Sequence, residues 1–301
     1  MRIRIIRYFF VRLYNFFLSL SEGAPKRILG KIITLYKKVF LRKVILKDFD
    51  SDIKILLNPN NSSGQQEYFL YYDTYDKSNF DFIKRYLKKG MVVVDIGANI
   101  GLYSMFFSKY VGENGKIISF EPFPVTYEHL LQNLKINNIC NVTAYNYAIS
   151  DRKESRVIYK DQYNDGANSL VFDENNNGNE KVTTLIFDDF WNETLSKLIS
   201  DINLIKIDVE GWELFVLKGM IKTLNEKSPV ILMGHNGFRY KQSSIEAYEF
   251  LAGLGYNCWE IHENKLRAVT ESAIMNDYDD VFIDFCYSKR NITEFNEALF
   301  K

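Results

Sequence analysis

The chain has 301 residues, which is long enough to bury a substantial core as one large domain or as one domain with an appendage. Its 38 basic residues balance its 38 acidic residues, so no overall basic excess points to nucleic acid as a partner. The three cysteines, Cys140, Cys258 and Cys286, are widely spaced and form no metal or redox motif, which fits ordinary buried thiols in a reducing compartment.

The N-terminal part of the chain is basic and amphipathic. Residues 1–47 contain twelve Lys or Arg residues and one acid, Glu22. The apolar stripe of the first helical segment is interrupted by Arg12, so the segment is too charged to span a bilayer, and it lacks a cleavage site. Residues 1–43 are therefore predicted to be a helical extension. It could lie on an anionic membrane surface at the inner, cytoplasmic face, or it could pack against the domain or a second subunit as an oligomer contact.

A β-hairpin and a helical region are predicted between residues 44 and 90. Residues 44–46 and 53–57 have strand character and are separated by an aspartate-rich turn. An aromatic stretch follows at residues 68–75, and helical spacing then continues to Gly90. This region could form a lid over a ligand, although plain packing is the more common role of such aromatic residues.

The central feature of the sequence is a buried strand that runs through a glycine turn into a helix. Residues 91–94 are apolar and mostly β-branched, and residues 100–110 have helical spacing. A dinucleotide fingerprint needs Gly-x-Gly-x-x-Gly, whereas the pattern here is Asp95-x-Gly97-x-x-x-Gly101. This pattern suits S-adenosylmethionine better, because a carboxylate at the strand end can order the amino-acid portion of that ligand directly or through water.

Strands and helices alternate after this turn. This order indicates a parallel sheet with right-handed crossovers, whose ligands gather beyond the carboxyl ends of the strands. Glu121 lies at such an end, 24 residues after Gly97, where a carboxylate commonly binds the two hydroxyls of a ribose. A polar insert at residues 161–180 is predicted to be a surface loop. The predicted strands are residues 116–120, 141–149, 156–160, 181–187, 202–207, 229–234, 257–261 and 281–285.

Two later strand ends carry candidate catalytic groups. One apolar strand ends at Asp208, and Glu210 and Glu213 follow it. These acids could bind a divalent cation, but negative charge at a helix start explains them more simply, so no metal site is predicted. A buried strand-end carboxylate such as Asp208 needs a partner. His235 follows the fifth strand toward the same crevice, so Asp208 and His235 are candidate bases, with Glu210 as a further candidate.

Three motifs together resemble the FkbM-type S-adenosylmethionine-dependent methyltransferases. They are VDIGANIGLYS at residues 94–104, FEP at residues 120–122 and IKIDVEGWE at residues 205–213. The resemblance covers roughly residues 66–235. It implies an α/β class I methyltransferase (Rossmann-like) fold with a doubly wound, mostly parallel, seven-stranded sheet over residues 91–288, followed by a tail at residues 289–301. The family often has an acidic residue directly before this histidine, whereas Gly234 precedes His235 in this chain.

The resemblance also implies the cofactor, S-adenosyl-L-methionine, and methyl transfer to a hydroxyl, with sugars and antibiotic precursors among the family's substrates. The expected acceptor is therefore a small molecule or a glycan, and no nucleic acid. The methionine portion is assigned to the glycine turn, the ribose to the FEP motif and the adenine to the region of Ser150. The expected cofactor-binding residues are Asp95, Gly97, Ala98, Asn99, Gly101, Glu121, Pro122, Ser150 and Asp208.

Three alternatives remain open at this point. A nicotinamide-linked oxidoreductase would use the same turn, but the glycine spacing argues against it. A catalytically inactive, nucleotide-binding or membrane-associated partner protein could keep the fold, although retention of every cofactor-side residue argues against that. Methylation at nitrogen is the third, but no Asn/Asp-Pro-Pro-Tyr-like tetrapeptide follows the fourth strand, and the neutral charge gives no nucleic-acid footprint.

Overall fold

The computed structural model describes residues 45–50, 52–57, 76–161, 168–172, 176–262, 265–278 and 281–293. The chain divides into two compact units, one comprising Met1–Tyr75 and Tyr163–Gly166 and the other Asp76–Gln162 and Ala167–Lys301. The predicted extension at residues 1–43 and the aromatic stretch at residues 68–75 lie outside the described residues. The predicted boundary at residue 90 falls later than the division at residue 75.

The smaller unit contains the predicted hairpin. Strand β1 (Ile45–Asp50) pairs antiparallel with β2 (Ile53–Leu57), and the register shifts between Asp48 and Asp50. The first strand therefore extends further into the aspartate-rich turn than the sequence predicts.

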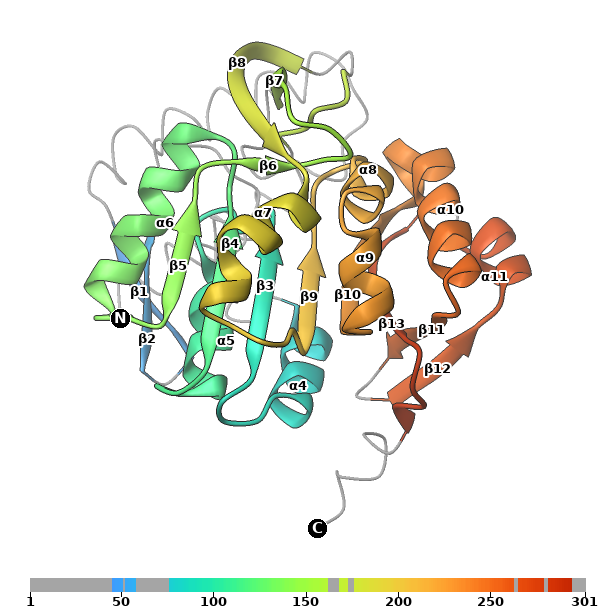
Figure 1. Ribbon diagram of the computed structural model, residues 1–301, viewed down its shortest axis with the longest axis horizontal. Helices are drawn as coiled ribbons and strands as arrows, with labels where there is room; N and C mark the ends of the chain where they lie inside the picture. The colour runs from blue at the N-terminus through green and yellow to red at the C-terminus, as the bar shows by residue number, and fades with distance from the viewer. Residues whose placement is uncertain are drawn as a thin grey trace, which may run out of the picture. The chain divides into compact units, whose positions relative to one another are not determined.

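An eight-stranded sheet forms the centre of the larger unit (Figure 1). Its strands are β3 (Val92–Ile96), β4 (Lys116–Phe120), β5 (Val142–Tyr145), β9 (Leu204–Ile207), β10 (Val230–Asn236), β11 (Asn257–His262), β12 (Lys265–Val269) and β13 (Phe282–Ser288). Their order is β12-β11-β13-β10-β9-β3-β4-β5. The pairs from β5 to β10 are parallel, whereas β13 is antiparallel to β10 and β11, and β12 is antiparallel to β11.

Helices cover both faces of this sheet. They are α4 (Lys77–Tyr86), α5 (Leu102–Val111), α6 (Pro124–Ile136), α7 (Phe187–Glu193), α8 (Glu213–Lys218), α9 (Ile221–Glu226), α10 (Gly237–Gly253) and α11 (Glu271–Asn276), with the short 3₁₀ helix η2 (Leu195–Lys197). Asp95 and Ser119 lie in register on one face, where Ser104 of α5 hydrogen-bonds to both. Because successive strand residues alternate between faces, Ile96 and Ile207 point the other way, into the hydrophobic core. Helices α7 to α10 lie over that face of the sheet (Figure 1).

The doubly wound, mostly parallel α/β architecture predicted from the sequence is confirmed. The seven expected strands of the sheet are present, and β12 adds an eighth at the edge. Helices α7 and α11 and strand β12 are not predicted by the sequence patterns. The predicted strand at residues 229–234 continues for two more residues, so His235 lies within β10 and pairs with Ile283.

The predicted single strand at residues 141–149 is wrong, because the chain turns within it. Strand β5 stops at Tyr145, and the Asn146 side chain donates to the carbonyls of Glu121 and Pro122 at 2.8 and 2.9 Å. The continuation, β6 (Ala148–Ile149), joins a separate three-stranded sheet with β8 and β7.

That three-stranded sheet also corrects the predicted surface loop at residues 161–180. Strand β7 (Ser155–Asp161) pairs antiparallel with β8 (Asn176–Leu185), so the asparagine-rich end of the predicted loop belongs to a strand. The predicted helix after residue 213 is likewise divided into α8 and α9. At the division, a Cβ on Gly219 would lie 2.0 Å from the carbonyl oxygen of Ser150, so only glycine allows this close approach.

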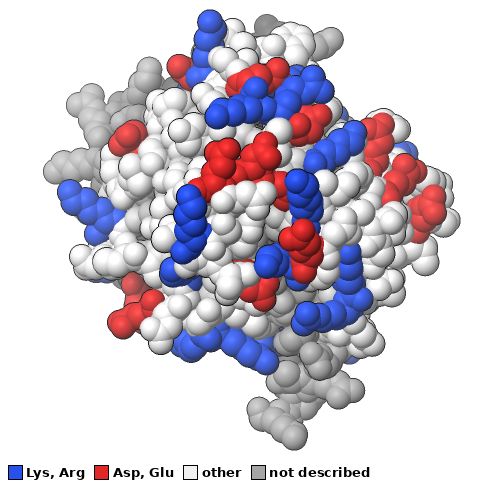
Figure 2. Space-filling model, viewed as in Figure 1, with Lys and Arg blue, Asp and Glu red and all other residues white. Residues whose placement is uncertain are grey.

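Basic and acidic side chains are interspersed on the face that carries α7 to α10, as Figure 2 shows. This mixture agrees with the zero net charge of the whole chain. Among the helices of the described segments, none has the length and apolar character needed to cross a membrane.

Replacement of Gly97 by alanine is expected to destabilise the protein by about 3 kcal/mol or to prevent folding. The residue has a φ of +83°, and an added Cβ would lie 1.9 Å from the carbonyl oxygen of Asp208. A left-handed backbone costs a non-glycine residue about 1–2 kcal/mol, and overpacking adds about 1–3 kcal/mol. Urea unfolding of the two proteins measures the difference. Gly253→Ala is the matched control, because its Cβ would meet no atom within 4 Å; equal losses in both variants would contradict this account.

Candidate active site

The glycine turn is held in place by neighbouring strands. The N–H groups of Gly97 and Ala98 both donate to the carbonyl of Phe120, at 2.9 and 3.0 Å. The N–H of Asp208 donates to the carbonyl of Ile96 at 3.0 Å, so the end of β9 lies against the turn. The carboxyl ends of β3, β4 and β9 therefore meet at this turn, as the parallel arrangement predicts.

Glu121 closes the turn from the end of β4. Its Oε2 accepts from the N–H of Asn99 and its Oε1 from the N–H of Phe123, both at 2.9 Å. Asn99 has a φ of +50°, and Gly101 begins α5 with a φ of +89°. Burial raises the pKa of Glu121 to about 7, against the opposing effect of the two backbone hydrogen bonds. The carboxyl group thus fixes the conformation that the turn requires.

Asp95 is buried at the end of β3, beneath the turn. Ser104 donates to its Oδ2 at 2.5 Å, and the Ser104 hydroxyl also lies 2.8 Å from that of Ser119. Burial raises the pKa of Asp95 to about 6, while the charge of Lys206 and the hydrogen bond from Ser104 act in the opposite direction. Asp95 is therefore a carboxyl group that changes charge within the physiological range of pH.

Pro122 and Ser150 are two further residues predicted to bind the cofactor, and both make hydrogen bonds within the protein. The Pro122 carbonyl accepts the hydrogen bond from Asn146 described above. Ser150 is fully buried, and its hydroxyl accepts from the indole N–H of Trp212 at 3.2 Å. The region of Ser150 therefore packs against Trp212 rather than presenting its hydroxyl at a surface.

A buried lysine that the sequence reasoning missed lies in the middle of β9. Lys206 is only 2% exposed, and its Nζ lies 2.8 Å from Oδ2 of Asp208 and 4.4 Å from the ring centre of Tyr103. Burial alone would lower the pKa of Lys206, but the negative charges of Asp208, Asp284 and Asp95 outweigh it and raise the pKa above its ordinary value. The lysine is therefore charged and is held by the acids around it.

Asp284 of β13 is the second group that the sequence reasoning missed. Its Oδ2 accepts from Nδ2 of Asn79 on α4 at 2.6 Å. The same Asn79 nitrogen lies 3.4 Å from the hydroxyl of Tyr103, which in turn donates to Asp76. Burial raises the pKa of Asp284 to about 7, against the opposing charge of Lys206. A polar network thus connects α4, α5, β9 and β13 on one face of the sheet.

The loop after β9 is held by its own acids. Oε1 of Glu213 accepts from the N–H groups of Gly211 and Val209, at 3.2 and 3.4 Å. Glu210 has a φ of +51° and accepts from Nδ2 of Asn236 at 3.3 Å. Burial raises the pKa of Glu210 to about 8 and that of Glu213 to about 7. These contacts fit a structural role for both acids. Among the described residues, no group of three or more His, Cys, Asp or Glu side chains is placed to hold a metal ion.

The structure does not bring His235 together with Asp208. The carboxylates of Asp208 and Asp284 lie on the side of β10 toward which Gly234 would point its side chain, and the next residue of a strand points to the opposite face. Nε2 of His235 lies 3.1 Å from the carbonyl oxygen of Tyr278, and the ring packs against Phe285. Its position within the strand, one residue beyond the predicted end, accounts for this orientation.

A sequence signal for the missed groups exists. Lys206 stands alone in the apolar run Leu204–Ile207, and Asp284 stands alone between Ile283 and Phe285. A single charge within an otherwise buried strand needs compensation, so each residue indicates a polar partner on a neighbouring element. Asn79 gives no comparable signal, because an asparagine in an amphipathic helix is common.

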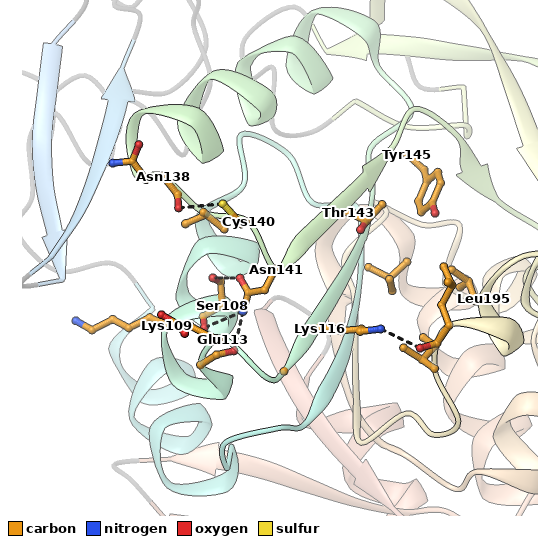
Figure 3. A pocket seen from close by; sticks show the side chains of 16 residues that line it. Ser108, Lys109, Glu113, Lys116, Asn138, Cys140, Asn141, Thr143, Tyr145 and Leu195 are labelled. Atoms are coloured by element: carbon orange, nitrogen blue, oxygen red, sulfur yellow. Dashed lines mark hydrogen bonds between the residues drawn. The ribbon is translucent and has the colours of Figure 1, made fainter.

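A cavity of about 750 Å³ opens at a different place in the larger unit (Figure 3). Its lining includes Cys140, Asn141 and Leu195, and Lys116 donates to the carbonyl of Leu198 at 2.9 Å on one side. Residues from the ends of α5, from the start of β4 and from η2 surround it. None of the predicted site residues lines this cavity, so it is separate from the strand ends that carry the motifs.

Comparison with known proteins identifies the family. Residues 95–258, more than half of the chain, match the FkbM methyltransferase domain. The chain is 25% identical over 144 residues to methyltransferase 1 of Beauveria bassiana, and this match covers 42% of this chain and 57% of that protein. It is 28% identical over 179 residues to methyltransferase sdnD of Sordaria araneosa, and this match covers 50% of this chain and 68% of that protein. It is 29% identical over 155 residues to the hexuronic acid methyltransferase AglP of Haloferax volcanii, and this match covers 48% of this chain and 56% of that protein. The chain thus spans little more than half the length of two of these relatives.

Solved structures with a similar chain course include a methyltransferase FkbM from Methylobacillus flagellatus, with 15% identity, a TM-score of 0.45, and coverage of 67% of this chain and 43% of that one. A SAM-dependent O-methyltransferase from Thermotoga maritima has 14% identity, a TM-score of 0.39, and coverage of 72% and 67%. The domain match begins at Asp95 and includes the glycine turn, Glu121 and the acidic end of β9. The chain belongs to the FkbM methyltransferase domain family.

Proposed function

We propose that this methyltransferase uses S-adenosylmethionine to methylate a hydroxyl group of a sugar or glycan. The observation that carries the proposal is the contact between the Gly97 turn and the backbone of Asp208, because it joins the turn that suits the methyl donor to an acidic group suited to an acceptor. The similarity to AglP, which is named a hexuronic acid methyltransferase, supports a sugar as the acceptor.

The residues of the turn fit the methyl donor. Gly97 carries no side chain at the point where the chain must pass against Asp208, and each oxygen of Glu121 uses one acceptor site on a backbone N–H. A carboxylate has about four acceptor sites, so Glu121 retains capacity for the two hydroxyls of a ribose. Asp95 would order the amino group of the methionine portion, either directly or through a bridging water molecule. When bound, the cofactor supplies a methyl group that is already activated on a sulfonium.

The protein must position the acceptor and accept its proton. A sugar hydroxyl is not ionised at neutral pH, so a base beside it is required. Asp208 is 24% exposed at the end of β9, and Lys206 fixes its Oδ2. We assign Asp208 to the acceptor side of the site. Glu210 supports the adjoining loop, and His235 supports β10 and β13 from the other face of the sheet.

The proposal includes an acceptor near a membrane. The twelve basic residues and single acid in residues 1–47 would favour an anionic surface, and a lipid-linked glycan assembled at the cytoplasmic face would then lie within reach. Glycan and glycolipid fractions from cells with and without the gene test the function by mass spectrometry. Loss of one or more methyl groups from a species in either fraction is the expected result, and identical spectra in both fractions would contradict the proposal.

Asp95→Asn should weaken binding of S-adenosylhomocysteine and reduce its pH dependence, leaving the part that Glu121 contributes. The carboxyl of Asp95, with a pKa of about 6, gains most of its charge as the pH rises from 5 to 7, a range in which an α-amino group stays mostly positive. Affinity of the natural protein should therefore rise with pH, by up to about tenfold. Calorimetric titration at pH 5 and pH 7 measures this, with the exposed Asp189→Asn as the control. A pH dependence of the same size in Asp95→Asn and in the natural protein would refute the assigned role.

Glu121→Gln should abolish the preference for a ribose over a deoxyribose. At pH 8 the carboxylate is mostly ionised and can accept from both ribose hydroxyls. The natural protein should bind adenosine several-fold more tightly than 2′-deoxyadenosine, and the variant should bind the two ligands equally. The ratio of the two dissociation constants is insensitive to a general loosening of the turn. Glu226→Gln, at an exposed position, is expected to keep the preference. If Glu121→Gln also keeps the preference for ribose, Glu121 only accepts hydrogen bonds from the backbone and does not bind the ribose.

A further inference from the structure

Two carboxylates face one another across Gly234. This glycine on β10 pairs in register with Asp284 of β13, and β9 lies on its other side. A Cβ placed on Gly234 would lie 3.5 Å from Oδ1 of Asp284 and 3.6 Å from Oδ1 of Asp208. Because glycine has no side chain, a small space remains between two carboxylate oxygens that come from different strands.

Each of the two oxygen atoms that border this space belongs to a carboxylate whose other oxygen is already paired. Oδ2 of Asp284 accepts from Asn79, and Oδ2 of Asp208 is paired with Lys206. Asp284 is 8% exposed, and its buried Oδ1 has no hydrogen-bond partner among the described residues. Leaving a buried oxygen unpaired is unfavourable, and more so for a charged group. A missing O–H donor at this position would remove that cost.

We propose that the space over Gly234 binds the acceptor hydroxyl and that Asp284 is the catalytic carboxylate that takes its proton, while Asp208 orients the hydroxyl from the other side. The proposal rests on the proposed function and names a residue of that same site which the sequence motifs do not include. Its ligand is an uncharged hydroxyl of a sugar, because an anionic oxygen would be repelled by both carboxylates.

Asp284 is better suited than Asp208 to take the proton. The ammonium group of Lys206 pairs directly with Oδ2 of Asp208 at 2.8 Å, whereas Oδ2 of Asp284 accepts from the uncharged amide of Asn79 at 2.6 Å. Burial raises the pKa of Asp284 to about 7, which matches a base that works near neutral pH. In the step itself, the hydroxyl oxygen forms a bond to the methyl carbon, the carbon–sulfur bond breaks with its electron pair going to sulfur, and the hydroxyl proton passes to Asp284.

Two variants of the full-length chain test the proposal by different means. Gly234→Ala fills the space with a methyl group at ordinary contact distance, and the backbone of this residue is not in the left-handed region, so the fold should tolerate it. Asp284→Asn removes the base and keeps an oxygen that accepts from Asn79. Gly253→Ala is the matched control for the glycine replacement.

Each variant is returned to cells that lack the gene, and methylated species are measured by mass spectrometry of the glycan and glycolipid fractions. Binding of S-adenosylhomocysteine to each purified protein is measured in parallel. General acid–base catalysis contributes about 10²- to 10⁴-fold, so Gly234→Ala and Asp284→Asn should restore about a tenth of the natural methylation or less. Both should bind S-adenosylhomocysteine within about twofold of the natural protein, and Gly253→Ala should restore methylation fully.

Full methylation by Gly234→Ala and by Asp284→Asn would overturn the acceptor subsite while leaving the proposed function intact. Failure of the natural gene to change any species would instead overturn the proposed function and the subsite together. If Asp284→Asn loses binding of S-adenosylhomocysteine through misfolding, Gly234→Ala decides the outcome alone.

Discussion

The polar side of this molecule depends on one buried positive charge. Removing the ammonium group of Lys206 from water costs several kcal/mol, and the surrounding chain offsets that cost with carboxylates. Asp208 supplies a direct ion pair, and Asp95 and Asp284 add negative charge from strands on either side. Three strands that are distant in the sequence must therefore place their acids at the same level of the sheet. Loss of one partner from a buried pair costs about 3–5 kcal/mol, so these positions constrain one another.

This constraint divides the acids of the site into two groups. Glu121 and Glu213 accept backbone N–H groups and fix loops, as buried carboxylates commonly do. Asp208 and Asp284 instead each keep one oxygen that faces the space over Gly234. Position in the sequence does not separate these groups, because Asp208 and Glu213 are only five residues apart. The difference lies in which backbone donors each carboxylate can reach.

The parts of the site that lie close together in the sequence could be predicted from it. The Gly97 turn, Glu121 and Asp208 follow from strand periodicity and from the rule that ligands gather at the carboxyl ends of parallel strands. The partnership of Asp284 with Asn79 could not be predicted, because these residues are 205 positions apart and meet only through the pairing of β13 with β10. His235 shows the same limit, since two extra residues of strand decide which face of the sheet its ring occupies.

The hydrogen bond from Ser169 to the carbonyl of Glu210, at 2.5 Å, connects the three-stranded sheet to the acidic loop. Ser169 also bridges to Tyr159 of β7, and Glu210 continues the connection to Asn236 at the end of β10. The glycine turn lies against the start of the same loop, through the contact of Gly97 with the backbone of Asp208. A displacement of Tyr159 would therefore be passed through Ser169 and Glu210 to Asn236, so the position of the acidic loop depends on the three-stranded sheet as well as on β9.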